Sequence, residues 1–179
     1  MNNYYLIIKL KIIFLRLFRF ISKPDLLVIS KQDYHVKNIL LFFPIDEKTF
    51  RISIYALRNL LTLNNSSVKL TLIVNTIHKP LIDNNHNEVV GIDWNSKKNR
   101  IDNQIIIKQY IDNKNYDMII DLNTSFYLSI ARLLNTIKSN YKLGFISDFS
   151  DYFYNIQINI KKNQILERSF KQVERMILK

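Results

Sequence analysis

The chain has 179 residues, no cysteine and a formal net charge of +11. Hydrophobic residues make up 47% of it, which excludes an intrinsically disordered protein, and the length predicts one domain with a substantial core. The lack of cysteine excludes disulfides, thiolate nucleophiles and cysteine metal sites, and it is consistent with a cytoplasmic location.

Residues 4–21 are apolar apart from four basic residues, Lys9, Lys11, Arg16 and Arg19. No charge-free stretch among them is long enough to span a bilayer. At about 100° per residue, the basic side chains occupy one half of a helix and apolar side chains crowd the other half. The apolar half contains Leu6, Leu10, Ile13, Phe14, Leu17 and Phe20. The segment is therefore predicted to be a basic amphipathic helix.

This helix has two interpretations that the sequence leaves open. In the first, its four basic residues face an anionic lipid surface, and the protein is peripheral on the inner membrane. In the second, the helix packs against the domain with its basic residues in water. Seven of the 26 basic residues lie in residues 1–38, against two of the 15 acidic residues, so the basic excess is densest here. Nucleic-acid binding ranks low because charge alone suggests it and no known motif occurs.

After Pro24 and Asp25, a short apolar run at 26–29 leads to a polar stretch. This pattern predicts a linker or strand-like arm, so we separate residues 1–37 from a domain at 38–179. Within that domain, apolar runs alternate with helical patterns. Strands are expected at 39–43, 68–74, 89–92, 117–122, 141–145 and 156–160, and helices near 47–63, 102–112, 124–137 and 164–178. Apolar strands separated by helices predict an α/β fold, a single Rossmann-like domain of three layers with a mostly parallel sheet.

Several common site motifs are absent from the sequence. Only two glycines occur, Gly91 and Gly144, which excludes glycine-rich dinucleotide loops and Walker phosphate loops. No Asp-x-Asp pair occurs, and we expect neither a cofactor nor a metal. The histidines are expected to be solvated loop residues, and a zinc site from His78, Asp83 and His86 is the alternative.

In open α/β sheets, function collects at the carboxyl ends of the strands. After the first strand, Asp46 or Glu47 could act as general base toward a hydroxyl acceptor, while Lys48 and Arg51 bind its phosphate. The alternative for Asp46 is a structural role as the cap of the following helix.

Two further loops supply candidate acceptor-binding residues. The first follows the strand at 117–122 and offers Asp121, Asn123 and Ser125, although Asn123 or Thr124 could instead cap the next helix. The second, at 147–154, offers Asp148 and several aromatic side chains. These aromatic side chains could stack on a sugar ring or close the core against the last helix.

Five short segments occur in a fixed order along residues 38–146: Ile39-Leu40-Leu41-Phe42, Tyr55-Ala56-Leu57-Arg58, the strand at 116–122, Ala131-Arg132-Leu133 and Gly144-Phe145. In combination they resemble the N-terminal domain of the heptosyltransferases, glycosyltransferase family nine of lipopolysaccharide assembly. The resemblance implies transfer of a sugar to a lipid-linked acceptor. It also implies a second α/β domain that binds the nucleotide sugar.

The chain departs from the family pattern at two points. The family typically holds an Asp-x-x-Gly-Asp motif in the loop after its first strand. In ungapped register, the Gly-Asp of this motif falls on Lys48-Thr49, so Thr49 stands where the acidic base is expected. The chain ends at Lys179, after one domain. The resemblance therefore implies a catalytically impaired domain of envelope glycan assembly, or one that depends on a second, nucleotide-sugar-binding chain. A non-catalytic binding or scaffold domain at the membrane surface is the alternative.

Overall fold

The computed structural model describes residues 3–21, 36–62, 68–82, 87–160 and 165–178. Most of the predicted linker, together with His35, Asp83 and His86, lies outside these ranges. None of the helices in these ranges is long and apolar enough to cross a membrane.

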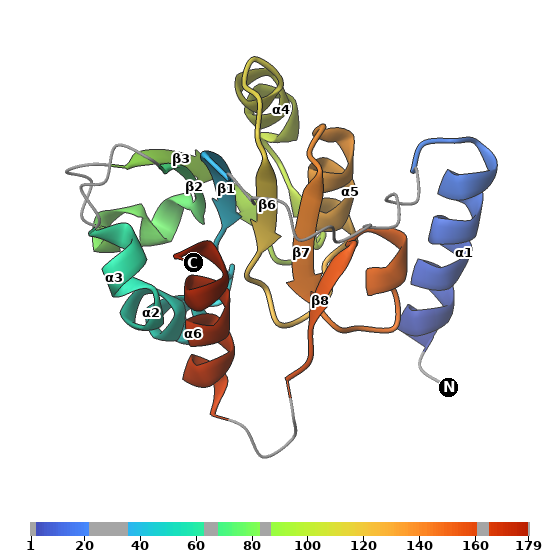
Figure 1. The fold of residues 1–179 in the computed structure, drawn as a ribbon. Coiled ribbons are helices and arrows are strands. Elements are labelled where there is room, and N and C mark those ends of the chain that lie inside the picture. The colour runs from blue at the N-terminus through green and yellow to red at the C-terminus, as the bar shows by residue number, and fades with distance from the viewer. Residues whose placement is uncertain (1–2, 22–35, 63–67, 83–86, 161–164, 179) are drawn as a thin grey trace.

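A six-stranded parallel sheet forms the centre of the molecule (Figure 1). Its strands are β1 (Asn38–Phe42), β2 (Lys69–Asn75), β3 (Glu88–Ile92), β6 (Met118–Asp121), β7 (Tyr141–Phe145) and β8 (Ile156–Ile158), in the order β3-β2-β1-β6-β7-β8. The central strands are apolar on both faces because helices cover both sides of the sheet. The predicted α/β fold with a parallel sheet is confirmed.

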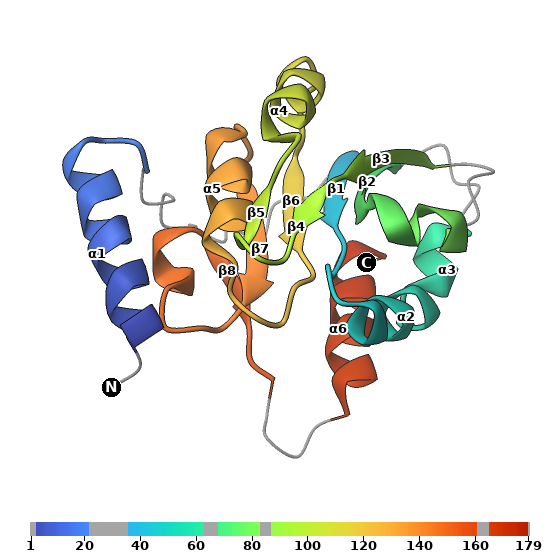
Figure 2. The same ribbon diagram turned by 180° about the vertical axis from the view of Figure 1, so that it is seen from behind.

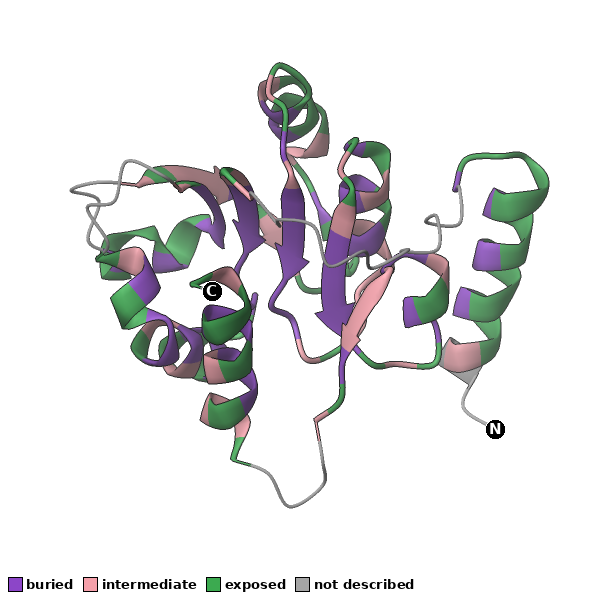
Figure 3. Cartoon of the chain, in the orientation of Figure 1, coloured by how far each residue is buried: buried purple, intermediate pink, exposed green. Residues whose placement is uncertain are grey.

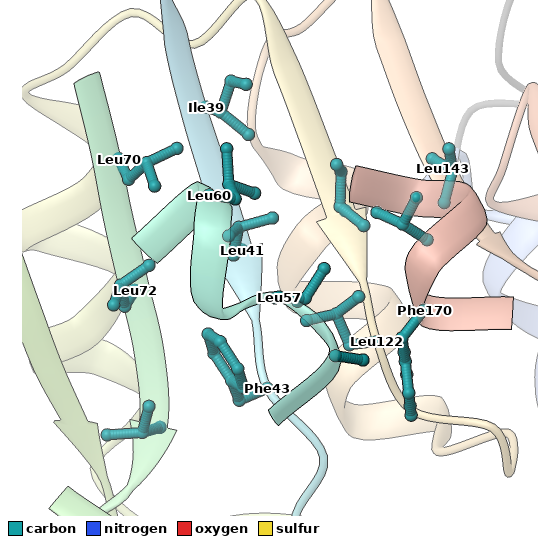
Figure 4. Packing of buried hydrophobic residues seen from close by; sticks show 14 of the residues in the cluster. Ile39, Leu41, Phe43, Leu57, Leu60, Leu70, Leu72, Leu122, Leu143 and Phe170 are labelled. Atoms are coloured by element: carbon teal, nitrogen blue, oxygen red, sulfur yellow. The ribbon is translucent and has the colours of Figure 1, made fainter. Parts of the chain in front are cut away.

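The helices form two layers around the sheet (Figures 1 and 2). One face carries α2 (Glu47–Ala56), α3 (Arg58–Leu61) and α6 (Leu166–Ile177), and the other carries α4 (Gln104–Asp112) and α5 (Leu128–Thr136). Alternate residues of β1 point to opposite layers: Leu41 packs in the first and Leu40 in the second. Figure 3 shows the central strands β1, β6 and β7 as largely buried, and Figure 4 shows the first layer closing over Leu41 with Leu57 and Phe170.

Two predicted helices differ from those observed, and one observed hairpin was not predicted. The helix expected at 47–63 is divided into α2 and α3 at the buried Leu57, and the helix expected from residue 124 begins at Leu128. A hairpin of β4 (Trp94–Asn95) and β5 (Arg100–Ile101) was not predicted, because strands of two residues are too short to show a periodic pattern. Short 3-10 segments, η1 (Thr76–Leu81) and η2 (Ser150–Tyr152), lie after β2 and between β7 and β8, respectively.

The N-terminal helix α1 (Asn3–Leu17) packs against the domain. Ile8, Ile12 and Leu15 are buried in one cluster with Ala131 of α5 and the aromatic side chains that follow β7. Those aromatic side chains, Phe149, Phe153 and Tyr154, thus close a core against α1. The expectation that they close it against the last helix is wrong, since α6 lies on the other side of the sheet beside α2.

Lys142 is a buried cation at the opposite end of the sheet from the predicted site. Its ammonium group donates a hydrogen bond of 2.9 Å to the carbonyl oxygen of Asn135 in the last turn of α5, where the helix dipole favours a cation. Burial nevertheless lowers the pKa of Lys142 to about 8. The folded state therefore holds this proton less tightly than the unfolded chain.

Replacing Lys142 with methionine is expected to raise the free energy of unfolding at pH 7 by roughly 1 kcal/mol, after allowance for solvent screening. Between the folded pKa of about 8 and the ordinary lysine pKa of 10.5, the unfolded chain binds more protons, so the stability of the natural protein rises with pH. The advantage of Lys142→Met should shrink over this window. Urea unfolding at several pH values measures it, and a difference that does not change with pH would contradict the explanation.

Candidate functional site

The predicted site residues of the domain lie at the carboxyl edge of the parallel sheet. Phe42 at the end of β1 pairs in register with Asp121 at the end of β6, so the two strands end level. The loops that follow β1, β6 and β7 therefore leave the sheet at the same edge. The sequence prediction placed its candidate base and acceptor-binding residues on these three loops.

The first loop leads into α2, where Asp46 is the N-cap. Its Oδ1 accepts a hydrogen bond of 2.8 Å from the backbone N–H of Thr49, and its side chain is exposed. The capping interpretation of Asp46 is confirmed. Glu47 pairs with Arg51 one turn later, with 2.7 Å between Glu47 Oε1 and Arg51 Nη2, and both are exposed. Lys48 is exposed beside them.

Replacing Asp46 with alanine is expected to lower the free energy of unfolding by about 1 kcal/mol, because a backbone N–H of the first turn loses its acceptor. Asp46→Asn keeps an oxygen in the capping position and should lower it by a few tenths at most. Thermal unfolding of both variants measures the effect. Equal losses for asparagine and alanine would contradict the capping role. In a transfer assay, the two variants also separate a cap from a base, because asparagine cannot take a proton.

Asp121 ends β6 and is buried within the second loop. Its Oδ2 accepts a hydrogen bond of 2.5 Å from the hydroxyl of Tyr154, and its Oδ1 accepts two bonds from Asn123, one from the backbone N–H at 3.0 Å and one from Nδ2 at 2.8 Å. Burial raises the pKa of Asp121, and these donors oppose the rise. Burial and the neighbouring carboxylate raise the pKa of Tyr154. The pair ties the loop after β7 to the end of β6.

Asn123 carries the link from the second loop to the first. Its Oδ1 accepts a hydrogen bond of 3.0 Å from the backbone N–H of Ile45. On the other side, Nε2 of His78 lies 3.1 Å from the carbonyl oxygen of Ile45, which makes Nε2 the protonated ring nitrogen. The His78 ring also stacks on Phe50, with 4.7 Å between the ring centroids. The backbone N–H and the carbonyl oxygen of Ile45 are thus both hydrogen-bonded, and these bonds fix the position of the adjacent Asp46.

Ser125 and Asp148 are exposed on the second and third loops. Asn123 and Asp121 are buried, and their side chains form hydrogen bonds within the protein. The expectation that Asn123 or Thr124 caps the next helix is wrong, because α5 starts at Leu128 after Tyr127, which provides no side-chain cap bond. The roles proposed for the base and acceptor-binding residues stay predictions.

Two residues of this edge were missed or misjudged from the sequence. His78 was expected to be a solvated loop residue, but it is 3% exposed and clamps the first loop. Tyr154 was noted only as one aromatic of its loop. Both act on partners at least 33 positions away, and no local spacing signals such a contact. Within the described ranges, no group of three or more histidine or acidic side chains could hold a metal ion.

The four basic residues of the N-terminal segment, Lys9, Lys11, Arg16 and Arg19, are exposed, as both interpretations of the helix require. The guanidinium of Arg16 lies 5.0 Å from the centroid of the Tyr152 ring, so it stacks on the domain. Ile8, Ile12 and Leu15 dock the helix from the half that carries these charges. The apolar half therefore faces outward.

Similar folds occur among solved glycosyltransferases. Escherichia coli heptosyltransferase WaaC with ADP aligns with a TM-score of 0.59 and 15% identity, covering 78% of this chain and 47% of that one. A glycosyltransferase of family 9 from Veillonella parvula aligns with a TM-score of 0.61 and 13% identity, covering 86% of this chain and 43% of that one. Escherichia coli ADP-heptose lipopolysaccharide heptosyltransferase II aligns with a TM-score of 0.57 and 14% identity, covering 76% of this chain and 40% of that one.

The chain therefore has a heptosyltransferase-like fold. It spans less than half the length of each of these three enzymes. No family model and no curated protein matches the sequence.

The segments that carry the resemblance occupy structural positions in this heptosyltransferase-like fold. Ala56 and Leu57 are fully buried where α2 meets α3, and Arg58 stacks over Tyr55 at 4.7 Å on the surface. Gly144 lies in β7 against the ring of Tyr154. The resemblance thus rests mainly on residues that build the core.

Proposed function

We propose that this chain is a heptosyltransferase-like domain of envelope glycan assembly that binds an anionic, lipid-linked acceptor and does not transfer sugar by itself. The observation that carries the proposal is the structural match to the heptosyltransferases, which covers between 76% and 86% of this chain. The exposed Lys48 and Ser125 at the carboxyl edge offer a cation and a hydroxyl to an acceptor phosphate. Sugar transfer would require a nucleotide-sugar site, and we propose that a partner chain provides it.

The state of the acidic residues supports catalytic impairment. Asp46 gives one oxygen to the helix cap, Glu47 is paired with Arg51, and Asp121 is buried against Tyr154. Thr49, which stands where the family has its acidic base, donates its backbone N–H to Asp46 and is largely buried. A general base needs a carboxylate with a free lone pair directed at the acceptor hydroxyl. Among the candidate carboxylates of this edge, Asp46, Glu47 and Asp148 are exposed, whereas Asp121 is buried.

We also propose that the domain works as a peripheral protein at the inner membrane, where a lipid-linked acceptor is found. The outward apolar half of α1 and the basic residues at its borders support this location. The alternative of a non-catalytic scaffold at the same surface shares this feature. The proposed acceptor-binding domain and the non-catalytic scaffold differ only in whether a partner chain restores sugar transfer.

A transfer assay tests the proposal. The purified chain, given ADP-heptose and a deacylated phosphorylated lipopolysaccharide-core acceptor, is expected to release no ADP above background. Release of ADP by the chain alone would contradict the proposal, provided that this release is lost in Asp46→Asn, which keeps the cap, or in Glu47→Gln. If a partner chain restores transfer, Asp46→Asn and Glu47→Gln identify the base.

A further inference from the structure

The outward half of α1 forms an uncovered apolar surface among the described residues. Its large side chains are between 44% and 76% exposed: Leu6, Ile7, Leu10, Ile13, Phe14 and Leu17. At about 100° per residue, these side chains lie opposite the docked Ile8, Ile12 and Leu15. Figure 3 shows the helix buried toward the domain and exposed on its outer side. A continuous apolar surface of this kind marks an interaction site.

A groove of about 1070 Å³ runs along one border of this surface, between α1, the start of α5 and the β4–β5 hairpin. Figure 2 shows these elements on the same side of the sheet. One wall is apolar and consists of Ile7, Leu10 and Phe14 from α1. Because Leu10 and Phe14 belong both to this wall and to the outward surface, the groove and the surface are continuous.

The other wall is basic. It carries Lys97, Lys98 and Arg100 of the hairpin and Arg132 of α5, and Lys11 of α1 completes the set. These cations come from three elements that are far apart in the sequence.

No acidic side chain lines the groove among the described residues. Arg100 is paired with Asp102 just outside it, at 2.9 Å between Nε and Oδ1. Lys11, Lys97, Lys98 and Arg132 form no ion pair with any described residue. The basic wall therefore keeps an excess of positive charge directed at whatever occupies the groove.

We propose that this groove seats the phosphate of an anionic bilayer phospholipid, while the acyl chains lie along the outward apolar surface of α1. The inference builds on the proposed membrane location and gives it a defined site. An anionic phospholipid matches both walls, because a phosphate suits Lys and Arg and an acyl chain suits Leu10 and Phe14. A nucleic acid would leave the apolar wall uncovered, and a second copy of this chain would bring two basic walls together.

The site assigns the membrane contact to the folded domain rather than to α1 alone. Lys97, Lys98 and Arg132 reach the lipid only when α1 is docked beside α5 and the hairpin. Of the four basic residues first expected to face lipid, Lys11 lines the groove, whereas Arg16 is stacked on Tyr152. Helix α1 would lie along the membrane plane, with the docked face toward the domain.

Flotation of the full chain with vesicles tests the proposal. Binding is expected with vesicles that contain phosphatidylglycerol and to be at least about tenfold weaker with pure phosphatidylcholine, and it should weaken with added salt. Leu10→Ser with Phe14→Ser, and separately Lys97→Gln with Lys98→Gln and Arg132→Gln, should each weaken binding at least tenfold. Matched controls on α4 are Ile105→Ser with Ile106→Ser, which are 75% and 67% exposed in the natural chain, and Lys108→Gln. The controls should bind as the natural chain does.

Equal binding to both kinds of vesicle would overturn the proposal that the groove is a lipid site. Loss of binding in the Leu10→Ser and Phe14→Ser variant, but not in the variant that lacks Lys97, Lys98 and Arg132, would overturn it as well. Thermal unfolding checks that each variant is folded. A second measurement uses the Trp94→Phe background, since Trp94 is the only tryptophan. Brominated phosphatidylglycerol should quench Leu10→Trp and leave Ile105→Trp unquenched. The transfer assay above uses a soluble acceptor without vesicles, so failure here leaves its result unaffected.

Discussion

Replacing Gly144 with alanine is expected to lower the free energy of unfolding by roughly 2–3 kcal/mol. A Cβ at this position of β7 would lie 2.6 Å from Cδ2 and 2.7 Å from Cε2 of the Tyr154 ring, which is closer than such atoms can approach. The ring cannot move away easily, because its hydroxyl is bound to the buried Asp121 at 2.5 Å. Overpacking in a buried site of this kind forces strain on the backbone or breaks the hydrogen bond.

Urea unfolding measures the effect, and Gly91 provides the matched control. Gly91 is the other glycine of the sheet, and a Cβ there would lie 3.0 Å from the Thr76 hydroxyl oxygen and 3.7 Å from Cα and Cβ of Thr76. Gly91→Ala should therefore cost clearly less than Gly144→Ala. In a Tyr154→Ala background, the cost of Gly144→Ala should largely vanish. An unchanged cost in that background would show that the ring is not the cause.

Replacing Asp121 with leucine is expected to cost about 3 kcal/mol or more, because three buried donors lose their acceptor at once. The hydroxyl of Tyr154 and two N–H groups of Asn123 would remain without partners, and Asn123 would hold Ile45 less firmly. Tyr154→Phe removes a single donor and should cost about 1 kcal/mol. Chemical unfolding measures both changes, and equal costs for the two variants would contradict a network centred on the carboxylate.

The pH dependence of this site has a defined sign. Burial raises the pKa of Asp121 in the folded state, so the folded chain keeps its proton to a higher pH than the unfolded chain. The contribution of the group to stability is therefore complete below the unfolded pKa of about 3.9 and is lost as pH rises through the folded pKa. Compared with Asp121→Asn, the natural protein should lose stability over this window.

The layered fold was predictable because its strands are long and apolar on both faces. Leu40 and Leu41 serve opposite layers, and such continuous apolar runs occur when helices cover both sides of a parallel sheet. The β4–β5 hairpin was not predictable, since two-residue strands leave no pattern. This matters for function, because the hairpin supplies Lys97 and Lys98 to the groove.

For helix α1, the sequence pattern predicted the helix correctly but not the face that docks on the domain. Its charged half was expected to face lipid or water, yet Ile8, Ile12 and Leu15 lie between those charges and dock the helix. Long Lys and Arg stems extend past buried neighbours and keep their charges in water, so a helical projection alone does not reveal the docked face.

The candidate site was predictable only where its contacts are local. The cap at Asp46 involves Thr49, three residues away, and the spacing suggested it. The clamp on Ile45 by Asn123 and His78 joins residues 78 and 33 positions apart, which only the folded sheet brings together.

The most direct test of the proposed function is calorimetric titration of the 179-residue chain with two soluble ligands, ADP and a deacylated phosphorylated lipopolysaccharide-core acceptor. We expect saturable binding of the acceptor, weakened by Lys48→Ala and unchanged by Lys108→Ala, with no binding of ADP. Saturable binding of ADP with no binding of the acceptor would contradict the account, because the chain would then be the nucleotide-sugar side of the enzyme.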